Sequence, residues 1–376
     1  MKININKNNF FFFSKTNFSK LEINGAEYLD FNFFFSKFFL NFKFVLFFFL
    51  RNHNYSNFIN NFFFCFNEKL YFFLCRILFI YYIKIQNFFL DKDETLKFQF
   101  LTYDFFFIET VVIKKIRNSF LSSICISTQL GCVVGCKFCS VSKLKFLRNL
   151  LCSEILFQIY NILYFLFFFD FFYLSNLSII KKILFMGVGE PLNNYNNLLD
   201  SILILNSKFS LNILQKDLIV STSGVINNIY KLLKDSKVTI NISLNHSSNK
   251  SRKLIVPLAN KYNIFNIQNI FNLYSKIVTN RLTFSYVLIS QINDSFLDLF
   301  LISIFFLKNK TKLNLIFFNK NYFSFYENFY FFNFLFFKNF LKFLKIQFQV
   351  RNVKGYLSKS SCGSLSYDYI YRKRYF

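Results

Sequence analysis

Three closely spaced cysteines are the most informative feature of the sequence. Cys132, Cys136 and Cys139 have Cys-x3-Cys-x2-Cys spacing, and Gly131 and Gly135 lie among them. This spacing brings three soft thiolates into one loop, which suits iron and does not suit hard cations. Such a loop can hold three irons of a [4Fe–4S] cluster and leave the fourth iron open. That open iron can chelate S-adenosylmethionine, whose sulfonium is then cleaved reductively to a radical.

A disulfide and a structural zinc site are the alternatives for the same cysteines. Disulfides are rare in the cytoplasm, which is the expected compartment because the polar start of the chain has no secretory signal pattern. A zinc site would need a fourth Cys or His at a typical spacing, and no such residue lies nearby. His53 and His246 are the only histidines in the chain. The iron–sulfur interpretation is therefore favoured.

Around these cysteines the sequence resembles the radical S-adenosylmethionine enzymes. Within them it is similar to the methyltransferases that modify an adenosine of large-subunit ribosomal RNA. The resemblance runs from about Thr95 to Leu365. The segments that carry it are Cys125–Cys132, Phe146–Leu150, Ser153–Ile155, Met186–Leu192, Ser221–Gly224, Ile242–Asn245, Ile255–Pro257, Tyr286–Leu288, Asn314–Asn319, Val350–Gly355 and Ser361–Leu365.

The resemblance implies one [4Fe–4S] cluster per chain, with Cys132, Cys136 and Cys139 as its ligands, and S-adenosylmethionine as cofactor. It also implies a set of cofactor-binding residues around a Gly-Glu-Pro motif. These are Gly189, Glu190, Ser221, Ser243, Leu244, Asn245 and Asn319. Asn245 stands where the family has a histidine.

The family's chemistry implies roles for three further residues. Cys362 would carry the methyl group as S-methylcysteine, because C2 of adenine has an unreactive C–H bond and requires a radical route. Glu109 would accept and donate the proton; its apolar strand favours the neutral carboxyl. Cys125 would resolve the protein–RNA adduct through a transient disulfide with Cys362. Near Cys362 the family's acidic stretch is replaced by Tyr356–Lys359.

The chain must fold so that these residues meet. Short apolar runs alternate with longer, potentially helical segments beyond residue 121, which predicts an α/β fold with βα units. The runs are Lys182–Met186, Leu218–Val220, Val238–Leu244, Thr283–Ile289 and Leu313–Phe318. Together with the resemblance, this rhythm predicts a partial (β/α) TIM-type barrel over residues 121–376.

Two segments precede the expected catalytic domain. Residues 93–120 are expected to form a β-hairpin that turns around Tyr103-Asp104 and carries Glu109. Residues 1–92 are rich in Phe, Asn and Lys and show no sustained period, so we expect a helical, RNA-contacting accessory region. Cys65, Cys75 and Cys152 have no predicted role beyond packing.

The charge of the chain indicates a polyanionic partner. Lys plus Arg is 45 and Asp plus Glu is 19, which gives a net charge of +26. Basic residues flank the expected site, at Lys114–Arg117, at Lys143–Arg148 and at Arg372–Arg374, where they can contact phosphates. A membrane protein is disfavoured, because the longest apolar stretches contain charged or polar residues.

The expected activity is methylation of C2 of an adenosine in 23S ribosomal RNA, with a transfer RNA adenosine as a second substrate. An external electron donor and a thiol reductant would be needed, no membrane partner is expected, and the chain is expected to be a monomer. The nearest alternative is methylation of C8 of the same base. An inactive basic RNA-binding protein and a Phe-rich membrane protein are the alternatives from other classes.

Overall fold

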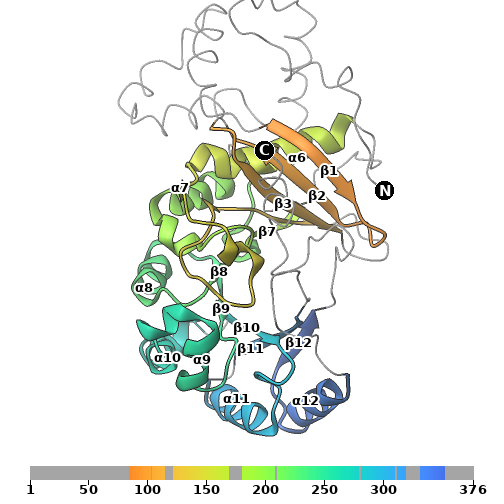
Figure 1. Ribbon diagram of the computed structural model, residues 1–376. Coiled ribbons are helices and arrows are strands. Elements are labelled where there is room, and N and C mark those ends of the chain that lie inside the picture. Colours follow the sequence, from red (N-terminus) through yellow and green to blue (C-terminus); the bar gives the residue numbers. More distant parts are fainter. Residues whose placement is uncertain are drawn as a thin grey trace, which may run out of the picture.

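Ten strands of the described residues form one long, curved sheet in the computed structural model (Figure 1), and β5 (Gln129–Leu130) and β6 (Arg148–Asn149) form a separate two-stranded sheet. The structure describes residues 84–102, 104–114, 122–168, 180–207, 210–278, 281–309, 311–318 and 331–351. The strand order is β1-β2-β3-β4-β7-β8-β9-β10-β11-β12. Their bounds are Lys84–Leu90, Leu96–Leu101, Phe107–Lys114, Ser122–Cys125, Ile180–Phe185, Leu218–Thr222, Thr239–Ser243, Leu282–Leu288, Lys312–Phe317 and Phe348–Arg351.

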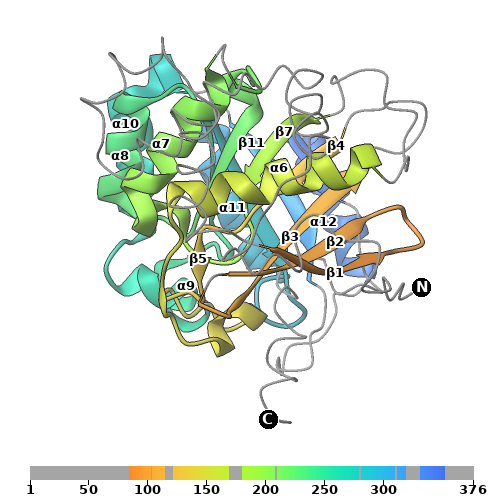
Figure 2. The same ribbon diagram turned by 90° about the horizontal axis from the view of Figure 1, so that it is seen from above.

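The sheet is antiparallel from β1 to β4 and parallel from β4 to β12. Each parallel connection contains a helix, and the helices lie on the outer side of the strands (Figures 1 and 2). They are α6 (Cys152–Phe168), α7 (Tyr195–Asn206), α8 (Ile226–Asp235), α9 (Asn249–Ile255), α10 (Ile264–Val278), α11 (Phe296–Asn309) and α12 (Phe331–Phe343). The partial (β/α) barrel predicted from the sequence is confirmed, and all five predicted apolar runs are strands.

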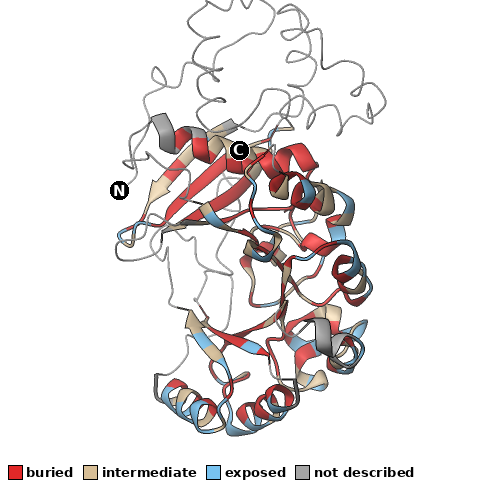
Figure 3. Cartoon of the chain, turned by 180° about the vertical axis from the view of Figure 1, so that it is seen from behind, coloured by how far each residue is buried: buried red, intermediate tan, exposed pale blue. Residues whose placement is uncertain are grey.

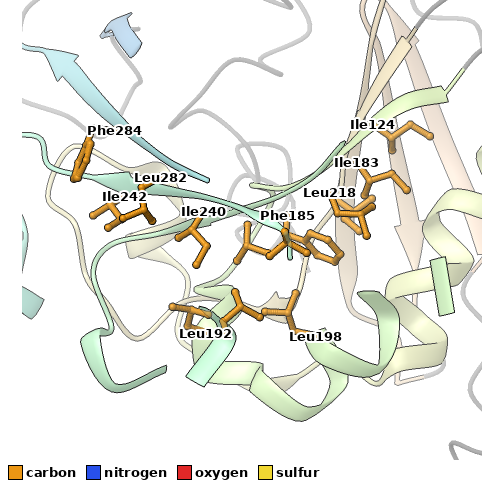
Figure 4. Close-up of a cluster of buried hydrophobic side chains, with 14 of the residues drawn as sticks. Ile124, Ile183, Phe185, Leu192, Leu198, Leu218, Ile240, Ile242, Leu282 and Phe284 are labelled. Carbon is orange, nitrogen blue, oxygen red and sulfur yellow. The ribbon is translucent and has the colours of Figure 1, made fainter. Parts of the chain in front are cut away.

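Alternation of side chains along the strands decides which face meets the helices. Leu218 and Val220 of β8, and Ile240 and Ile242 of β9, are buried in the main core. Figure 4 shows Ile240 and Phe185 lying between the strands and the helical segment that carries Leu192 and Leu198. Burial is correspondingly concentrated on the helix surfaces that face the sheet (Figure 3).

Helix α8 shows how the sequence forms this outer layer. Ile226, Ile229 and Leu232 recur at helical spacing and are buried, whereas Lys231 and Lys234 are exposed. An apolar stripe of this kind binds the helix to the sheet and leaves the charged face in water. Contact with the sheet, rather than intrinsic helix propensity, therefore accounts for most of the helix's stability.

Strands β2 and β3 form a hairpin, and β1 pairs with β2 as a third strand. β2 and β3 pair antiparallel, with Gln99 opposite Glu109. Strand β1 covers Lys84–Leu90, whereas the helical accessory region was expected to continue to residue 92. Phe88 explains the difference, since its ring meets Phe165 at 4.7 Å and Phe98 at 6.2 Å in the core beneath α6. This non-local packing favours a third strand.

Most of the accessory region expected at residues 1–92 lies outside the described residues. None of the helices in the described part of the chain combines the length and the apolarity that crossing a bilayer requires.

Candidate functional site

The inner face of the parallel strands, opposite the helices, carries polar side chains. Asn241 of β9 is buried there and connects its neighbours on the sheet. Its Oδ1 accepts from Thr283 Oγ1 at 3.0 Å and from Ser285 Oγ at 3.0 Å, while its Nδ2 donates to Ser221 Oγ at 3.1 Å. Asn314 Nδ2 of β11 also donates to Asn241 Oδ1, at 3.3 Å. This ladder was not predicted; the period-two alternation of polar residues in β9 and β10 was the signal for it.

The cysteine loop follows β5 (Gln129–Leu130) and ends at η3 (Ser140–Lys143). Cys132, Cys136 and Cys139 are all partly buried and pack against one apolar cluster that contains Val134, Phe138 and Val256. The amide of Lys137 donates to the carbonyl of Ile255 at 3.0 Å, which holds the loop against the end of α9. The three cysteines predicted as ligands therefore lie together.

Electrostatics within the loop depend on the proximity of the thiols. Burial, followed by the charges of Glu190 and Cys139, raises the pKa of Cys132 to about 12. Burial and then the charges of Cys139 and Cys132 also raise the pKa of Cys136, against a weak contact with Ser223 Oγ at 4.0 Å. Ionised thiols in this loop would repel one another, and a bound cation would relieve that repulsion.

The donor set of the loop fits a [4Fe–4S] cluster. Such a cluster takes thiolates one to an iron, and the loop brings three thiols together in a partly buried, largely apolar setting. Within the described residues, no group of three His, Cys, Asp or Glu side chains has the arrangement needed to hold a single metal ion.

Glu190 lies beside the loop, after the carboxyl end of β7. Its buried carboxylate accepts from the amide of Ser223 at 2.8 Å, through Oε2, and from the amide of Leu192 at 3.3 Å, through Oε1. Its own amide donates to Gln129 Oε1 at 2.8 Å. Burial raises the pKa of Glu190, although the hydrogen bonds from Ser223, Thr222 and Leu192 oppose that rise.

Two glycines before Glu190 permit close contact between backbone segments. A Cβ on Gly187 would lie 2.7 Å from the backbone of Ile126, and the Gly187 amide donates to the Ile126 carbonyl at 2.9 Å. Gly189 has φ +108°, and a Cβ there would lie 2.6 Å from Gln129 Cβ. Glycine is therefore required for the motif to lie against the segment that leads into the cysteine loop.

Cys125 ends β4 and lies next to the cysteine loop. It is buried in a cluster with Val111, Val141, Leu184 and Val188, and Cys132 and Cys139 pack against the same cluster. Cys152 is elsewhere, fully buried in the main core, where its Sγ accepts from Ser201 Oγ at 3.3 Å. Packing, as predicted, is the role the structure gives Cys152.

Glu109 has charged surroundings, which the sequence analysis did not anticipate. Its Oε1 lies 2.9 Å from Nζ of Lys97, and the two side chains are 2% and 0% exposed. Both residues share the inner face of the β2–β3 hairpin with Val111, which contacts the Cys125 cluster. Lys97 is thus a charged neighbour that the expectation of an apolar setting for Glu109 did not include.

The predicted cofactor-binding residues follow the carboxyl ends of the strands. Ser221 and Ser243 lie near the ends of β8 and β9 on the inner face, but Leu244 is buried in the main core. Asn245 has φ +58°, and its Oδ1 accepts from the amide of Val287 at 3.2 Å, so its side chain supports the backbone. Asn319 and Cys362 lie outside the described residues.

One predicted phosphate contact has another partner in the structure. Arg148 donates to both carboxylate oxygens of Asp104, at 2.8 and 2.9 Å, and to both of Glu154, at 2.7 and 2.8 Å. It therefore fixes the hairpin turn to the first turn of α6. Lys143 and Lys145 are exposed beside the cysteine loop and remain available to phosphates.

Comparison with known proteins finds relatives that are named as RNA methyltransferases. The chain is 39% identical over 207 residues to a probable dual-specificity RNA methyltransferase RlmN of Clostridium acetobutylicum, covering 54% of this chain and 55% of that protein. It is 35% identical over 224 residues to the protein of the same name from Clostridium novyi, covering 57% and 60%. The chain thus spans little more than half the length of the curated relatives it matches. No family model matches.

A solved structure supports the same relationship. The crystal structure of a radical SAM methyltransferase from Sphaerobacter thermophilus superposes with a TM-score of 0.73 at 26% identity, covering 80% of this chain and 85% of that one. The resemblance stated from the sequence motifs is confirmed by these relatives, in sequence and in fold.

Proposed function

From this kinship with radical S-adenosylmethionine methyltransferases, we propose that the protein methylates C2 of an adenosine in 23S ribosomal RNA. A transfer RNA adenosine is the second proposed substrate, since the curated relatives are named as dual-specificity RNA methyltransferases. The proposal depends mainly on one observation, which is that three groups lie close together on one side of the sheet. The cysteine loop, the Glu190 motif and Cys125 all lie at the carboxyl ends of β4 and β7.

The proposed cofactors are one [4Fe–4S] cluster, held by Cys132, Cys136 and Cys139, and S-adenosylmethionine. Together they supply a methyl group and a radical able to abstract hydrogen. Gly189, Glu190, Ser221 and Ser243 are proposed to bind the cofactor from the strand ends. Leu244 and Asn245 would contribute through their backbone, because their side chains are engaged in the core and with Val287. Asn319 is assigned from the family motif alone.

The remaining steps belong to residues of this chain. Cys362 accepts the methyl group and carries it to the ring as S-methylcysteine. Glu109 moves the proton at C2, with Lys97 as its ion-pair partner. Cys125 then attacks the sulfur of Cys362: an S–S bond forms, the bond from sulfur to the methylene carbon breaks, and that carbon, which keeps the electron pair, takes up a proton to become the methyl group on the ring. An external thiol reductant reopens the disulfide.

RNA binding is proposed to depend on the basic charge of the chain. The net charge of +26 and the exposed pair Lys143 and Lys145 beside the cysteine loop support this part of the proposal. The target adenosine must be unstacked to reach a site inside the barrel. The part of residues 1–92 that precedes strand β1 is proposed as an additional RNA-contacting region, and residues 121–376 as the catalytic domain. The protein is proposed to methylate ribosomal RNA in the cytoplasm.

Anaerobic reconstitution followed by an RNA methylation assay tests the proposal. The wild-type protein, with reductant, S-adenosylmethionine and a 23S ribosomal RNA fragment, should yield 2-methyladenosine after digestion and mass spectrometry. Cys362→Ala should retain its iron and yield no methylated base, whereas Cys136→Ala should lose the visible absorbance of the cluster. Formation of 8-methyladenosine would favour the C8 alternative. Tight RNA binding without any methylation would favour the inactive RNA-binding protein.

A further inference from the structure

Arg252 is a fully buried arginine on α9, behind the ends of the two strands that carry Ser221 and Ser243. Within the described residues, every hydrogen bond of its guanidinium goes to a backbone carbonyl. The acceptors are Ser223 O at 2.7 Å, Leu244 O at 2.9 Å, Tyr262 O at 3.1 Å and Ser243 O at 3.4 Å. Arg252 thus joins the carboxyl end of β8 to that of β9.

The charge of this guanidinium has no carboxylate partner among the described residues, where the ion pairs involve Lys97, Arg148 and His246 instead. Burial of a cation without a neighbouring anion is costly, and carbonyl dipoles compensate it only in part. Burial lowers the pKa of Arg252 to about 10, and the negative charge of Cys136 opposes this. Cys136, a residue of the cysteine loop, is thus close enough to Arg252 to interact with it electrostatically.

Ser223 connects the guanidinium to the loop by direct contacts. Its carbonyl accepts from Arg252 Nη2 at 2.7 Å, and its Oγ lies 4.0 Å from Cys136 Sγ. Its amide donates to Glu190 Oε2 at 2.8 Å. The next residue, Gly224, has φ +107°, and a Cβ there would lie 3.4 Å from Arg252 Nη2. The guanidinium is thus packed beneath the turn that touches Cys136.

Three thiolates leave a [4Fe–4S] cluster with a net negative charge, and reduction adds an electron to that charge. Net charge and local electrostatics are among the factors that set the reduction potential of such clusters. A buried positive charge near one ligand would stabilise the reduced form more than the oxidised form. In this chain Arg252 provides such a charge, close to Cys136.

We propose that Arg252 is a positioning residue of the iron–sulfur site, whose buried positive charge raises the reduction potential of the cluster and whose hydrogen bonds hold the Ser223 turn against Cys136. This inference rests on the proposed function, because it needs the cluster to be present. In this proposal the charge that stabilises the reduced cluster belongs to a residue outside both the cysteine loop and the Glu190 motif.

The test measures the midpoint potential of the reconstituted cluster by redox titration followed by electron paramagnetic resonance. Arg252→Met should reduce the equilibrium constant for one-electron reduction at least about tenfold, a shift of about 59 mV to lower potential. Arg252→Lys keeps the positive charge but loses the set of hydrogen bonds that the planar guanidinium makes to several carbonyls. Its potential should stay nearer that of the wild type, while its thermal stability falls as in Arg252→Met.

Arg281 provides a matched control at the opposite ends of the strands. It also donates to backbone carbonyls, namely Ser236 O at 2.6 Å, Val238 O at 3.2 Å and Leu233 O at 3.4 Å. Arg281→Met should lower stability and leave the potential unchanged. If Arg252→Met does not fold, Arg252→Gln, which keeps an amide donor, replaces it in the same comparison.

The possible outcomes are distinct. An unchanged potential in a charge-removing Arg252 variant that loads iron would overturn the inference, as would an equal shift in Arg281→Met. A lower potential only when the charge at residue 252 is lost would support it. A wild-type protein that binds no cluster would overturn both this inference and the proposed function, and iron analysis of the wild type reveals that outcome before any variant is compared.

Discussion

Nζ of Lys97 lies 2.9 Å from Oε1 of Glu109, in a pair whose two side chains are almost wholly excluded from solvent. The two residues are diagonal neighbours on adjacent strands, since Gln99 is opposite Glu109 and Lys97 is opposite Val111. The pair lies on the inner face of the hairpin. It also makes each partner dependent on the other.

Removal of Lys97 should therefore destabilise the protein strongly. Lys97→Met leaves a buried carboxylate without its ammonium neighbour, and we expect a loss of about 3–5 kcal/mol in the free energy of unfolding. The double variant Lys97→Met/Glu109→Gln should lose less than the sum of the two single variants. Urea unfolding measures all three. Additive losses would mean that the two charges do not stabilise each other.

The Arg148 bridge gives a prediction about pH. Partial burial acts to raise the pKa of Asp104, but hydrogen bonds and charge from Arg148 and a hydrogen bond from Thr102 hold it below its usual value. A depressed pKa in the folded state stabilises the protein above the unfolded-state value of about 3.9, and this contribution is lost as pH falls through the folded value. The stability difference between wild type and Asp104→Asn should be full at neutral pH and shrink below about pH 4.

Thermal unfolding at a series of pH values provides the measurement. The effect should be modest, because the side chains of Asp104 and Arg148 are 26% and 24% exposed and water screens the pair. A difference between the two proteins that grows as the solution is acidified would contradict the assignment of Arg148 as the cause.

Gly189 permits a comparison between two glycines with positive φ. A Cβ on Gly189 would lie 2.6 Å from Gln129 Cβ, whereas the nearest atom to a Cβ on Gly135, at φ +69°, is Pro257 Cγ at 3.8 Å. Gly189→Ala should cost at least about 2 kcal/mol from strain and displacement of Gln129, and Gly135→Ala about 1 kcal/mol from backbone strain alone. Equal losses in denaturant unfolding would show that crowding by Gln129 contributes nothing.

The sequence predicted the local features of the fold and of the site well. The short apolar runs at β8, β9 and β10 predicted strands, and the spacing of Cys132, Cys136 and Cys139 predicted a shared loop; all of these are present. Features that depend on strand register or on distant segments were not predicted. Lys97 meets Glu109 only because β2 and β3 pair in one register. Strand β1 forms because Phe88 packs on Phe165, far along the chain.

RNA binding should depend on the exposed lysines beside the cysteine loop. Lys143→Ala/Lys145→Ala should weaken RNA affinity and reduce the slope of log affinity against log salt by about 1–2, because two phosphate contacts and their released counterions are lost. Lys234→Ala/Lys237→Ala is the matched control, with the same change in charge on and after α8 on the outer side of the sheet. Filter binding over a range of salt concentrations compares them. Equal slopes in the two double variants would place the RNA elsewhere.

Cys125 and Cys152 distinguish a reacting thiol from a packing thiol. Cys125 shares its cluster with Cys132 and Cys139, whereas Cys152 lies in the main core and accepts a hydrogen bond from Ser201. Cys125→Ala should transfer the methyl group to the ring but fail to release it, so that a covalent protein–RNA species accumulates on denaturing gels and disappears after nuclease treatment. Cys152→Ala should release product normally and lose about 1 kcal/mol of stability through its small cavity. Normal turnover by Cys125→Ala, or trapping of RNA by Cys152→Ala, would show that the resolving thiol has been assigned to the wrong residue.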